Sequence, residues 1–143
     1  MANDWGVAAD LWSVTSFTEL RRDGLDAERR NRLHPGAAPV ASWVEHRPAP
    51  TLGPVVAVSD YLRTVPDLIR AWVPRRYVAL GTDGYGRSDT RAALRRFFEV
   101  DRHHIALAAL KALADDGALE PSRVEEAIAR YGIDVGGPNP WDY

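Results

Sequence analysis

Two short runs of apolar, mostly β-branched residues constrain the fold of this chain more than any other feature. They read "PVVAVS" at 54–59 and "YVALG" at 77–81, and each is typical of a strand buried on both faces of a parallel sheet. Between the runs, apolar residues recur at helical spacing. These residues are Leu62, Val65, Leu68, Ile69, Trp72 and Val73. A strand, a helix and a strand in this order predict a parallel pair with a helical crossover.

The helix between the two runs should have an N-cap residue at its start and an interruption of its hydrogen bonding at a proline. Ser59 or Asp60 is placed to accept hydrogen bonds from the first free N–H groups of the helix. Pro66 removes one backbone hydrogen bond, so we expect a kink there or a first turn that ends early.

The N-terminal third is expected to add one strand and two helices. The segment "GVAADLWSVTS" (6–16) combines apolar residues with small hydroxylated ones at its end, which predicts a strand and a turn. The segment 17–36 has a helical composition that Gly24 interrupts. We therefore expect two short helices, the second starting near Asp26 and ending before Pro35.

The C-terminal half is expected to be helical. A helix from about Asp89 to Phe98 should begin at Ser88 as its N-cap, and a second should cover 101–117 and stop at Gly117. A third, over 120–132, has Pro121 in its first turn, and the tail from 133 onward is turn-rich. The whole order predicts an α/β, three-layer domain with a mainly parallel sheet. Three strands are few for such a sheet.

Residues 35–54 hold five prolines and should form an extended connector over the surface. A connector of this length often exists to contact something. Trp43 lies within it, and Trp5 and Trp141 lie in flanking segments. These indoles either pack onto the domain itself or form a surface for a partner, and the sequence favours neither.

Composition narrows the class of protein. The chain has 143 residues, 45% hydrophobic and 27% charged, which suits one globular domain. A net charge of −2 with both signs interspersed gives no reason to expect a nucleic-acid or membrane partner. The first residues carry no secretory signal pattern, so a cytoplasmic location is the expectation. Without cysteine there are no disulfides and no thiolate metal sites.

The stretch "LGTDGYGRSDTR" (80–91) is the best local candidate for a binding site. A glycine-rich loop between a strand end and a helix can hold an anion. The candidate ligand or interface residues are Thr82, Asp83, Gly84, Gly86, Arg87, Ser88 and Arg91. The stretch is neither a phosphate-binding Walker loop nor a dinucleotide fingerprint. The alternative is structural: the glycines adopt positive φ, Ser88 caps a helix, and the arginines pair with the acids.

No residue pattern indicates a catalytic or metal site. His103 and His104 are adjacent, so on a helix they point about 100° apart and do not readily share a metal ion. None of the serines lies in a nucleophile-elbow motif.

Three long stretches in a fixed order resemble a known family. They are "DLWSVTSFTELRRDGLDAERRNRLHP", "VVAVSDYLRTVPDLIRAWVP" and "YVALGTDGYGRSDTRAALRRFFEVD", and a helical end reaching "YGID" follows. Together, from about Trp5 to Ile133, they resemble the C-terminal domain of the homodimeric pyruvate dehydrogenases. That domain has the transketolase C-terminal fold. The resemblance implies that a strand and a helix of the same domain precede the matched stretch in the family, which agrees with the low strand count.

The resemblance also implies a function for the whole enzyme. Family members use thiamine diphosphate and magnesium, held by their first two domains, to decarboxylate pyruvate oxidatively and to acetylate a lipoyl group. This sequence has no counterpart of the family's "GDG" motif; "TDG" at 82–84 belongs to the loop described above. The resemblance therefore carries no catalytic or cofactor-binding residue over to this chain. The implied partners are the other domains of the enzyme, its second subunit and, through them, the dihydrolipoyl acetyltransferase component.

Three hypotheses follow. In the first, the chain is the structural C-terminal portion of a pyruvate dehydrogenase. In the second, it is a free-standing α/β module that binds an anion or acidic metabolite at the 81–91 loop. In the third, it is an interaction module that uses the proline-rich connector and Trp43. We favour the first. It predicts that the chain alone, lacking its first strand and helix, is marginally stable, self-associates or needs a covering partner.

Overall fold

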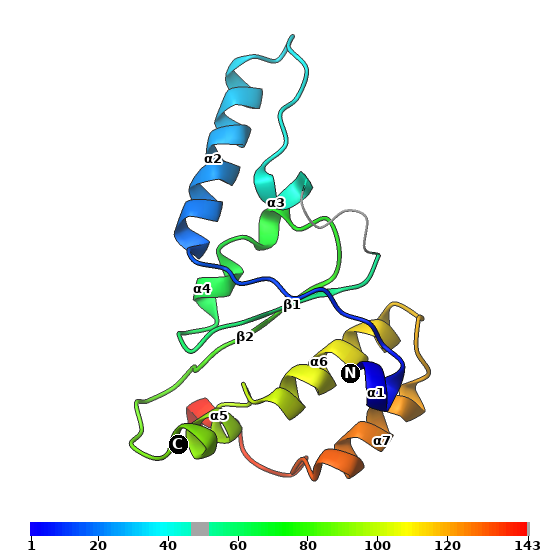
Figure 1. The fold of residues 1–143 in the computed structure, drawn as a ribbon. Coiled ribbons are helices and arrows are strands. Elements are labelled where there is room, and N and C mark those ends of the chain that lie inside the picture. Colours follow the sequence, from blue (N-terminus) through cyan, green and yellow to red (C-terminus); the bar gives the residue numbers. More distant parts are fainter. Residues whose placement is uncertain (47–51, 143) are drawn as a thin grey trace.

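A computed structural model gives the structure of the chain and describes residues 1–46 and 52–142. Its elements are a short parallel sheet, helices on both sides of it, and a helical C-terminal half (Figure 1). In chain order they are α1 (Ala2–Trp5), α2 (Phe17–Leu33), α3 (Trp43–His46), β1 (Val55–Val58), α4 (Thr64–Asp67), η1 (Arg70–Trp72), β2 (Tyr77–Leu80), α5 (Arg91–Phe97), α6 (Arg102–Asp115), α7 (Pro121–Tyr131) and η2 (Pro140–Asp142).

The two strands predicted from the apolar runs form the sheet. β1 and β2 pair in parallel, with Val55 opposite Tyr77 and Val58 opposite Leu80. The expected burial on both faces is wrong for β1, whose residues are all half-buried. In β2, the side chains of Tyr77 and Ala79 are buried, and those of Val78 and Leu80 are half-buried. Successive side chains of a strand point to opposite faces, so one face of β2 is the better covered.

The crossover between the strands is shorter than the predicted helix. It consists of one α-helical turn, α4, and the 3₁₀ turn η1. The expected early end at Pro66 is confirmed, since the helix stops at Asp67. The expected cap is wrong: Arg63 occupies the N-cap position without a side-chain bond, and the Ser59 hydroxyl oxygen accepts from the Tyr61 N–H instead.

Helices cover the sheet from two sides, so the α/β fold expected from the sequence is confirmed. α4 contacts β2, and α2 packs on α3 and α4. α6 contacts both strands from the side opposite to α4 and pairs with α7 (Figure 1). The predicted helices over 101–117 and 120–132 are also confirmed. Gly117 and Gly132 end them with positive φ, and Pro121 opens α7.

The predicted break at Gly24 is wrong, because α2 is one helix of 17 residues. Ser16 is its N-cap and accepts a hydrogen bond from the Glu19 N–H. Gly24 is buried against the ring of Trp72: a Cβ built on it would lie 2.4 Å from two indole carbons. The glycine therefore allows a close approach within a continuous helix, which outweighs its low helix propensity.

The strand predicted over 6–16 is absent, and this part of the chain has no regular secondary structure between α1 and α2. Leu11 is 95% exposed and Trp12 is 61% exposed. A strand is defined by its pairing, and no neighbouring strand lies beside this segment among residues 1–46 and 52–142. The apolar alternation alone could not reveal that.

Two further local expectations need correction. The connector over 35–54 is not entirely extended and superficial, because it contains α3, whose Val44 side chain is buried with Ser42 before it. Residues 47–51, including Pro48 and Pro50, lie outside the described residues. α5 starts at Arg91, and its N-cap is Thr90, which accepts from the Ala93 N–H, and not Ser88.

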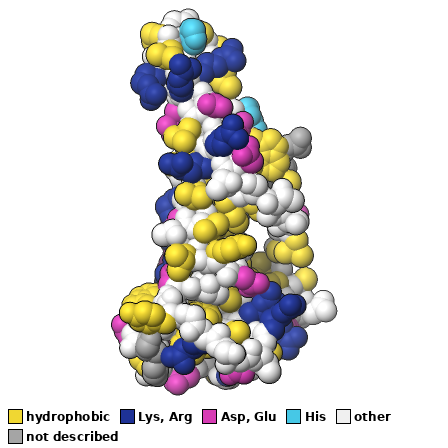
Figure 2. Space-filling view, turned by 90° about the vertical axis from the view of Figure 1, so that its left-hand side faces the viewer, with side chains coloured by type: hydrophobic (Ala, Val, Ile, Leu, Met, Phe, Trp, Pro, Cys, Tyr) yellow, Lys and Arg dark blue, Asp and Glu magenta, His cyan; other side chains and the backbone are white. Residues whose placement is uncertain are grey.

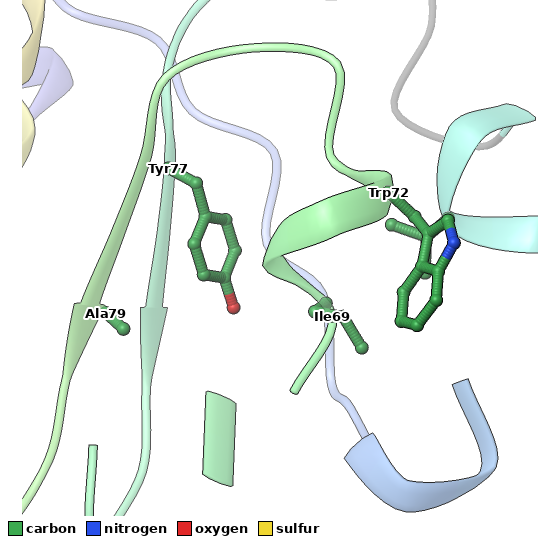
Figure 3. Close-up of a cluster of buried hydrophobic side chains, with 5 residues drawn as sticks. Ile69, Trp72, Tyr77 and Ala79 are labelled. Atoms are coloured by element: carbon green, nitrogen blue, oxygen red, sulfur yellow. The ribbon is translucent and has the colours of Figure 1, made fainter. Parts of the chain in front are cut away.

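The buried side chains form two separate clusters. The sheet cluster consists of Val44, Ile69, Trp72, Tyr77 and Ala79. Figure 3 shows Tyr77 and Ala79 of β2 pointing toward the turn that carries Ile69 and Trp72. The helical cluster consists of Trp5, Leu110, Val124 and Ala127. It joins the beginning of the chain to α6 and α7.

The tryptophans divide between the interior and the surface. Trp5 is buried, and its indole N–H donates to the Tyr131 hydroxyl at 2.5 Å. Trp72 is buried as well, whereas Trp12, Trp43 and Trp141 are exposed. Trp12 and Trp43 meet edge to face with their ring centroids 6.1 Å apart. The flanking positions thus supply both core and surface indoles.

Candidate functional site

The 81–91 loop leaves the carboxyl end of β2 and is tied at its start to the segment that follows β1. The Thr82 N–H donates to the Tyr61 carbonyl at 2.8 Å, and the Thr82 hydroxyl donates to the Asp60 carbonyl at 3.0 Å. A Cβ on Gly81 would lie 2.4 Å from the Arg63 nitrogen, so only glycine fits there without a shift. These contacts fix the loop over the ends of both strands.

Asp83 has a structural role in this loop. Its carboxylate accepts from the Arg63 N–H at 2.9 Å, and its other oxygen lies 3.3 Å from Nε of the same residue. The Arg63 guanidinium also lies over the Trp141 ring, 5.6 Å from the centroid. The acid that would repel an anion in this loop is therefore already paired with a cation.

The two loop glycines differ. Gly84 has φ of +112°, and a Cβ there would lie 3.1 Å from the Pro140 carbonyl oxygen and from the Trp141 Cα. The tail thus packs on the loop at the position where glycine is required. Gly86 has no positive φ and faces open space, so the expectation that both glycines adopt positive φ holds for Gly84 alone.

The remaining candidates form one side of a hollow. The Arg87 guanidinium lies over the Phe97 ring at 4.1 Å, and the Thr90 N–H donates to the Asp89 carboxylate at 2.6 Å. The hollow, of about 450 Å³, is lined by five of the seven candidate residues. They are Thr82, Gly84, Gly86, Arg87 and Arg91. Asp83 and Ser88 do not line it.

The histidines of α6 serve the helix itself. The Asp101 carboxylate accepts from the N–H groups of His103 and His104 at 3.0 and 2.9 Å and meets the His104 Nδ1 at 2.8 Å. Burial raises the pKa of Asp101, but these hydrogen bonds, most of them from His104, outweigh it and leave the pKa below its ordinary value. His103 stacks on Tyr131 with centroids 4.7 Å apart.

No metal centre can be assigned among the described residues. In the part of the chain that the structure describes, no group of three or more His, Cys, Asp or Glu side chains is arranged to hold a metal ion. None of the helices in that part combines the length and apolar character that crossing a bilayer requires.

Sequence reasoning missed the residues that organise the loop. Arg63, which pairs with Asp83, lies 20 residues before it in the chain. Trp141, which lies against Arg63, comes nearly 60 residues after Asp83. Asp60 pairs with Arg95 at 3.0 Å across the end of β1. These contacts join positions far apart in the chain. No local spacing could have indicated them.

A parallel strand pair, a helical crossover and a loop tied over the strand ends define an α/β domain. The chain belongs to the transketolase-like C-terminal domain family: the family model described as "Transketolase-like TK C-terminal domain" matches residues 1–101. The family resemblance expected from the sequence is confirmed.

Curated relatives extend the match to nearly the whole chain. The chain is 58% identical over 143 residues to the pyruvate dehydrogenase E1 component of Pseudomonas aeruginosa and 56% identical over 140 residues to that of Cupriavidus necator. It is 45% identical over 141 residues to that of Escherichia coli. These alignments cover 98 to 99% of this chain and 16% of the length of each relative.

Proposed function

We propose that this chain is the C-terminal, structural part of a cytoplasmic pyruvate dehydrogenase E1 component, where it supports the dimer while the reaction takes place on other domains. The observation that carries this proposal is the identity of 58% along essentially the entire chain to a protein of that name. The assembled enzyme would decarboxylate pyruvate oxidatively and acetylate a lipoyl group.

The cofactors of that reaction are assigned to the rest of the enzyme. Thiamine diphosphate supplies the carbanion chemistry when bound, and magnesium anchors its diphosphate. Binding the metal takes oxygen ligands from carboxylates and amides, and no three such carboxylates or histidines among the described residues are arranged to hold a metal ion. The described residues do not fit the cofactor site, so we assign no step of the reaction to them.

Two surfaces are open to the rest of the enzyme. The sheet has two strands, so each of them has a free edge among the described residues. The segment between α1 and α2 presents the exposed side chains of Leu11 and Trp12, and the ring of Trp43 adds to them. We propose that other parts of the E1 polypeptide and its second subunit cover this strand edge and apolar surface.

A chimeric enzyme tests the proposal. The segment of the Pseudomonas aeruginosa relative that aligns with this chain would be replaced by residues 1–143, and dimerisation and pyruvate-dependent CO₂ release would be measured. We expect an active dimer. Replacing Leu11 and Trp12 by serine in the chimera should weaken the dimer or lower its thermal stability, whereas the matched exposed pair Arg29→Gln and Arg32→Gln should do neither. A chimera that folds but never dimerises would refute the structural role.

The isolated chain provides the complementary test. Mixed with thiamine diphosphate, magnesium and pyruvate, it should release no CO₂. Turnover by the isolated chain would contradict the proposal directly.

A second candidate function is a free-standing module that binds an acidic metabolite at the 81–91 loop. The hollow of about 450 Å³ beside Arg87 and Arg91 favours it. Calorimetry with pyruvate and inorganic phosphate, on the chain and on its Arg87→Ala variant, would test it. The absence of any heat that depends on Arg87 would eliminate this function. The connector over 39–50, the basis of the interaction-module hypothesis, lies partly outside the described residues.

A further inference from the structure

A larger groove lies next to the loop hollow, between the end of β1, α5 and the first turn of α6. Its volume is about 850 Å³, within the range of small-molecule sites. Apolar side chains of Val58, Val100 and Ile105 form part of its wall. Ligands of open α/β sheets bind beyond the carboxyl ends of the strands, and this groove occupies that position at β1.

Cations dominate the polar lining of the groove. It is lined by four guanidinium groups and two carboxylates, which leaves two positive charges in excess. The cations are Arg91, Arg95, Arg96 and Arg102, and the acids are Asp60 and Asp101. The Arg102 Nε donates to the Nε2 of His103, which also lines the groove, at 3.3 Å. Figure 2 shows Lys and Arg side chains near the lower end of the molecule as well as toward its upper end.

Both acids are already engaged. Asp60 pairs with the Arg95 guanidinium at 3.0 Å, and Asp101 caps α6. Arg96 donates to the Gly132 carbonyl at 3.0 Å, which satisfies only one of its N–H groups. Arg91, Arg96 and Arg102 make no ion pair within the described ranges. The excess charge is therefore shared among these three arginines, two from α5 and one from α6.

This distribution of charge suits an anion. Arg91 and Arg95 are four residues apart on α5, so they lie on the same helix face, where Asp60 pairs with Arg95. Guanidinium groups bind phosphoryl and carboxylate oxygens with paired hydrogen bonds. The hydroxyl oxygen of Ser59, which also lines the groove, accepts from the Tyr61 N–H, so its own hydrogen remains available to a ligand.

We propose that this groove binds a small phosphorylated molecule, with the phosphoryl group between Arg91 and Arg102 and the body of the ligand against Val58, Val100 and Ile105. A phosphate monoester carries about −1.5 to −2 charges at neutral pH, which matches the excess of two, whereas a single carboxylate carries only one. The proposal stands on the groove of this chain and does not depend on the proposed enzymatic role.

Calorimetry on the 143-residue chain at constant ionic strength tests the groove. The probes are inorganic phosphate and glucose 6-phosphate, with glucose as the neutral control. The chain should bind both phosphates saturably and glucose not at all. Tighter binding of glucose 6-phosphate would assign the site to a phosphorylated metabolite, and equal affinities would assign it to the phosphate ion; either result supports a phosphoryl site.

Matched variants locate the binding. Arg91→Gln with Arg102→Gln should weaken phosphate binding at least about tenfold, because each hydrogen bond to a charged group contributes substantially. Arg29→Gln with Arg32→Gln on α2 makes the same change in net charge and should alter the affinity less than about twofold, since these exposed residues lie outside the groove. Both pairs are exposed, so the fold should persist, and circular dichroism would verify it.

The proposal fails on either of two results. One is the absence of saturable phosphate binding to the wild-type chain. The other is an equal loss of affinity in both double variants, which would show a general effect of net charge. Backbone amide shifts on adding phosphate should concentrate at 91–105 and 58–60. An active chimera without phosphate binding would refute the groove and leave the proposed function intact.

Discussion

Replacing Gly24 by alanine puts helix propensity and packing in opposition. In the middle of α2, alanine is favoured over glycine by about 1 kcal/mol. The new methyl group would, however, lie 2.4 Å from two Trp72 ring carbons and 2.8 Å from a third. Carbon atoms pack at about 3.5–4.0 Å, so the ring must move by roughly 1 Å.

That movement has a definite cost. Trp72 is buried in the sheet cluster, and its indole N–H donates to the Glu28 carboxylate at 3.0 Å. Overpacking of this kind costs typically about 1–3 kcal/mol, and a strained hydrogen bond adds to it. We therefore expect Gly24→Ala to lower the free energy of unfolding by about 1–2 kcal/mol, once the gain in propensity is subtracted. For a chain of this size that is a fall in Tm of roughly 3–7 °C.

Urea denaturation followed by circular dichroism measures the effect, and a second background tests its cause. In a Trp72→Leu chain, which is itself less stable, the space beside Gly24 is larger. There Gly24→Ala should be neutral or stabilising by up to about 1 kcal/mol. If the substitution stabilises the chain that retains Trp72, or costs the same in both backgrounds, the close approach of Gly24 and Trp72 does not explain the glycine.

Three further predictions concern other parts of the fold. Tyr77→Phe leaves the Pro66 carbonyl, which accepts from the Tyr77 hydroxyl at 2.6 Å, without its donor; unfolding should become easier by about 1–2 kcal/mol. Burial raises the pKa of Tyr77, so the wild type should lose stability as the pH rises above about 10. The Tyr77→Phe variant should lack that loss. Urea denaturation midpoints measured between about pH 8 and 11 would show the difference. Asp101→Ala removes the cap of α6 and should cost about 1 kcal/mol at pH 7. Because the folded pKa of Asp101 is lowered, this difference should persist down to about pH 4 and vanish as the pH falls through the folded pKa; a constant difference down to pH 2 would contradict the argument. Gly84 has φ of +112° and lies close to Trp141, so Gly84→Ala should lower the free energy of unfolding by about 1–3 kcal/mol. It should also speed amide exchange at 140–142. Unchanged exchange there would show that the tail does not depend on the loop.

The sequence predicted elements whose cause is local. The runs at 54–59 and 77–81 became β1 and β2 because β-branched residues between turn signals suit a strand that a crossover brings into pairing. The stop at Gly117 and the start at Pro121 likewise depend on backbone chemistry within a few residues.

The errors arose where a distant residue decides the outcome. Gly24 lies inside a helix because Trp72, almost fifty residues later, needs the space, and a helix breaker and a packing glycine look the same in sequence. The segment 6–16 has the pattern of a strand but no neighbour to pair with among the described residues. The early end of the crossover helix was predicted correctly, because its cause, Pro66, lies within the helix itself.

The candidate site was only partly predictable, for the same reason. The glycines and Arg87 of the 81–91 loop stand next to one another in the sequence and line one hollow in the structure. The groove beside it depends on Arg102 meeting the end of β1 from another helix. Only the folded chain brings those residues together.

The division of the interior into a sheet cluster and a helical cluster affects how the molecule tolerates change. The two groups share no buried residue, and substitutions without common neighbours usually combine additively. Variation around Leu110 and Ala127 can therefore accumulate without altering how Trp72 and Tyr77 fit together. Substitutions in one cluster can therefore accumulate independently of those in the other. The exception is the set of contacts between α6 and the two strands, where changes on one side must remain compatible with the other.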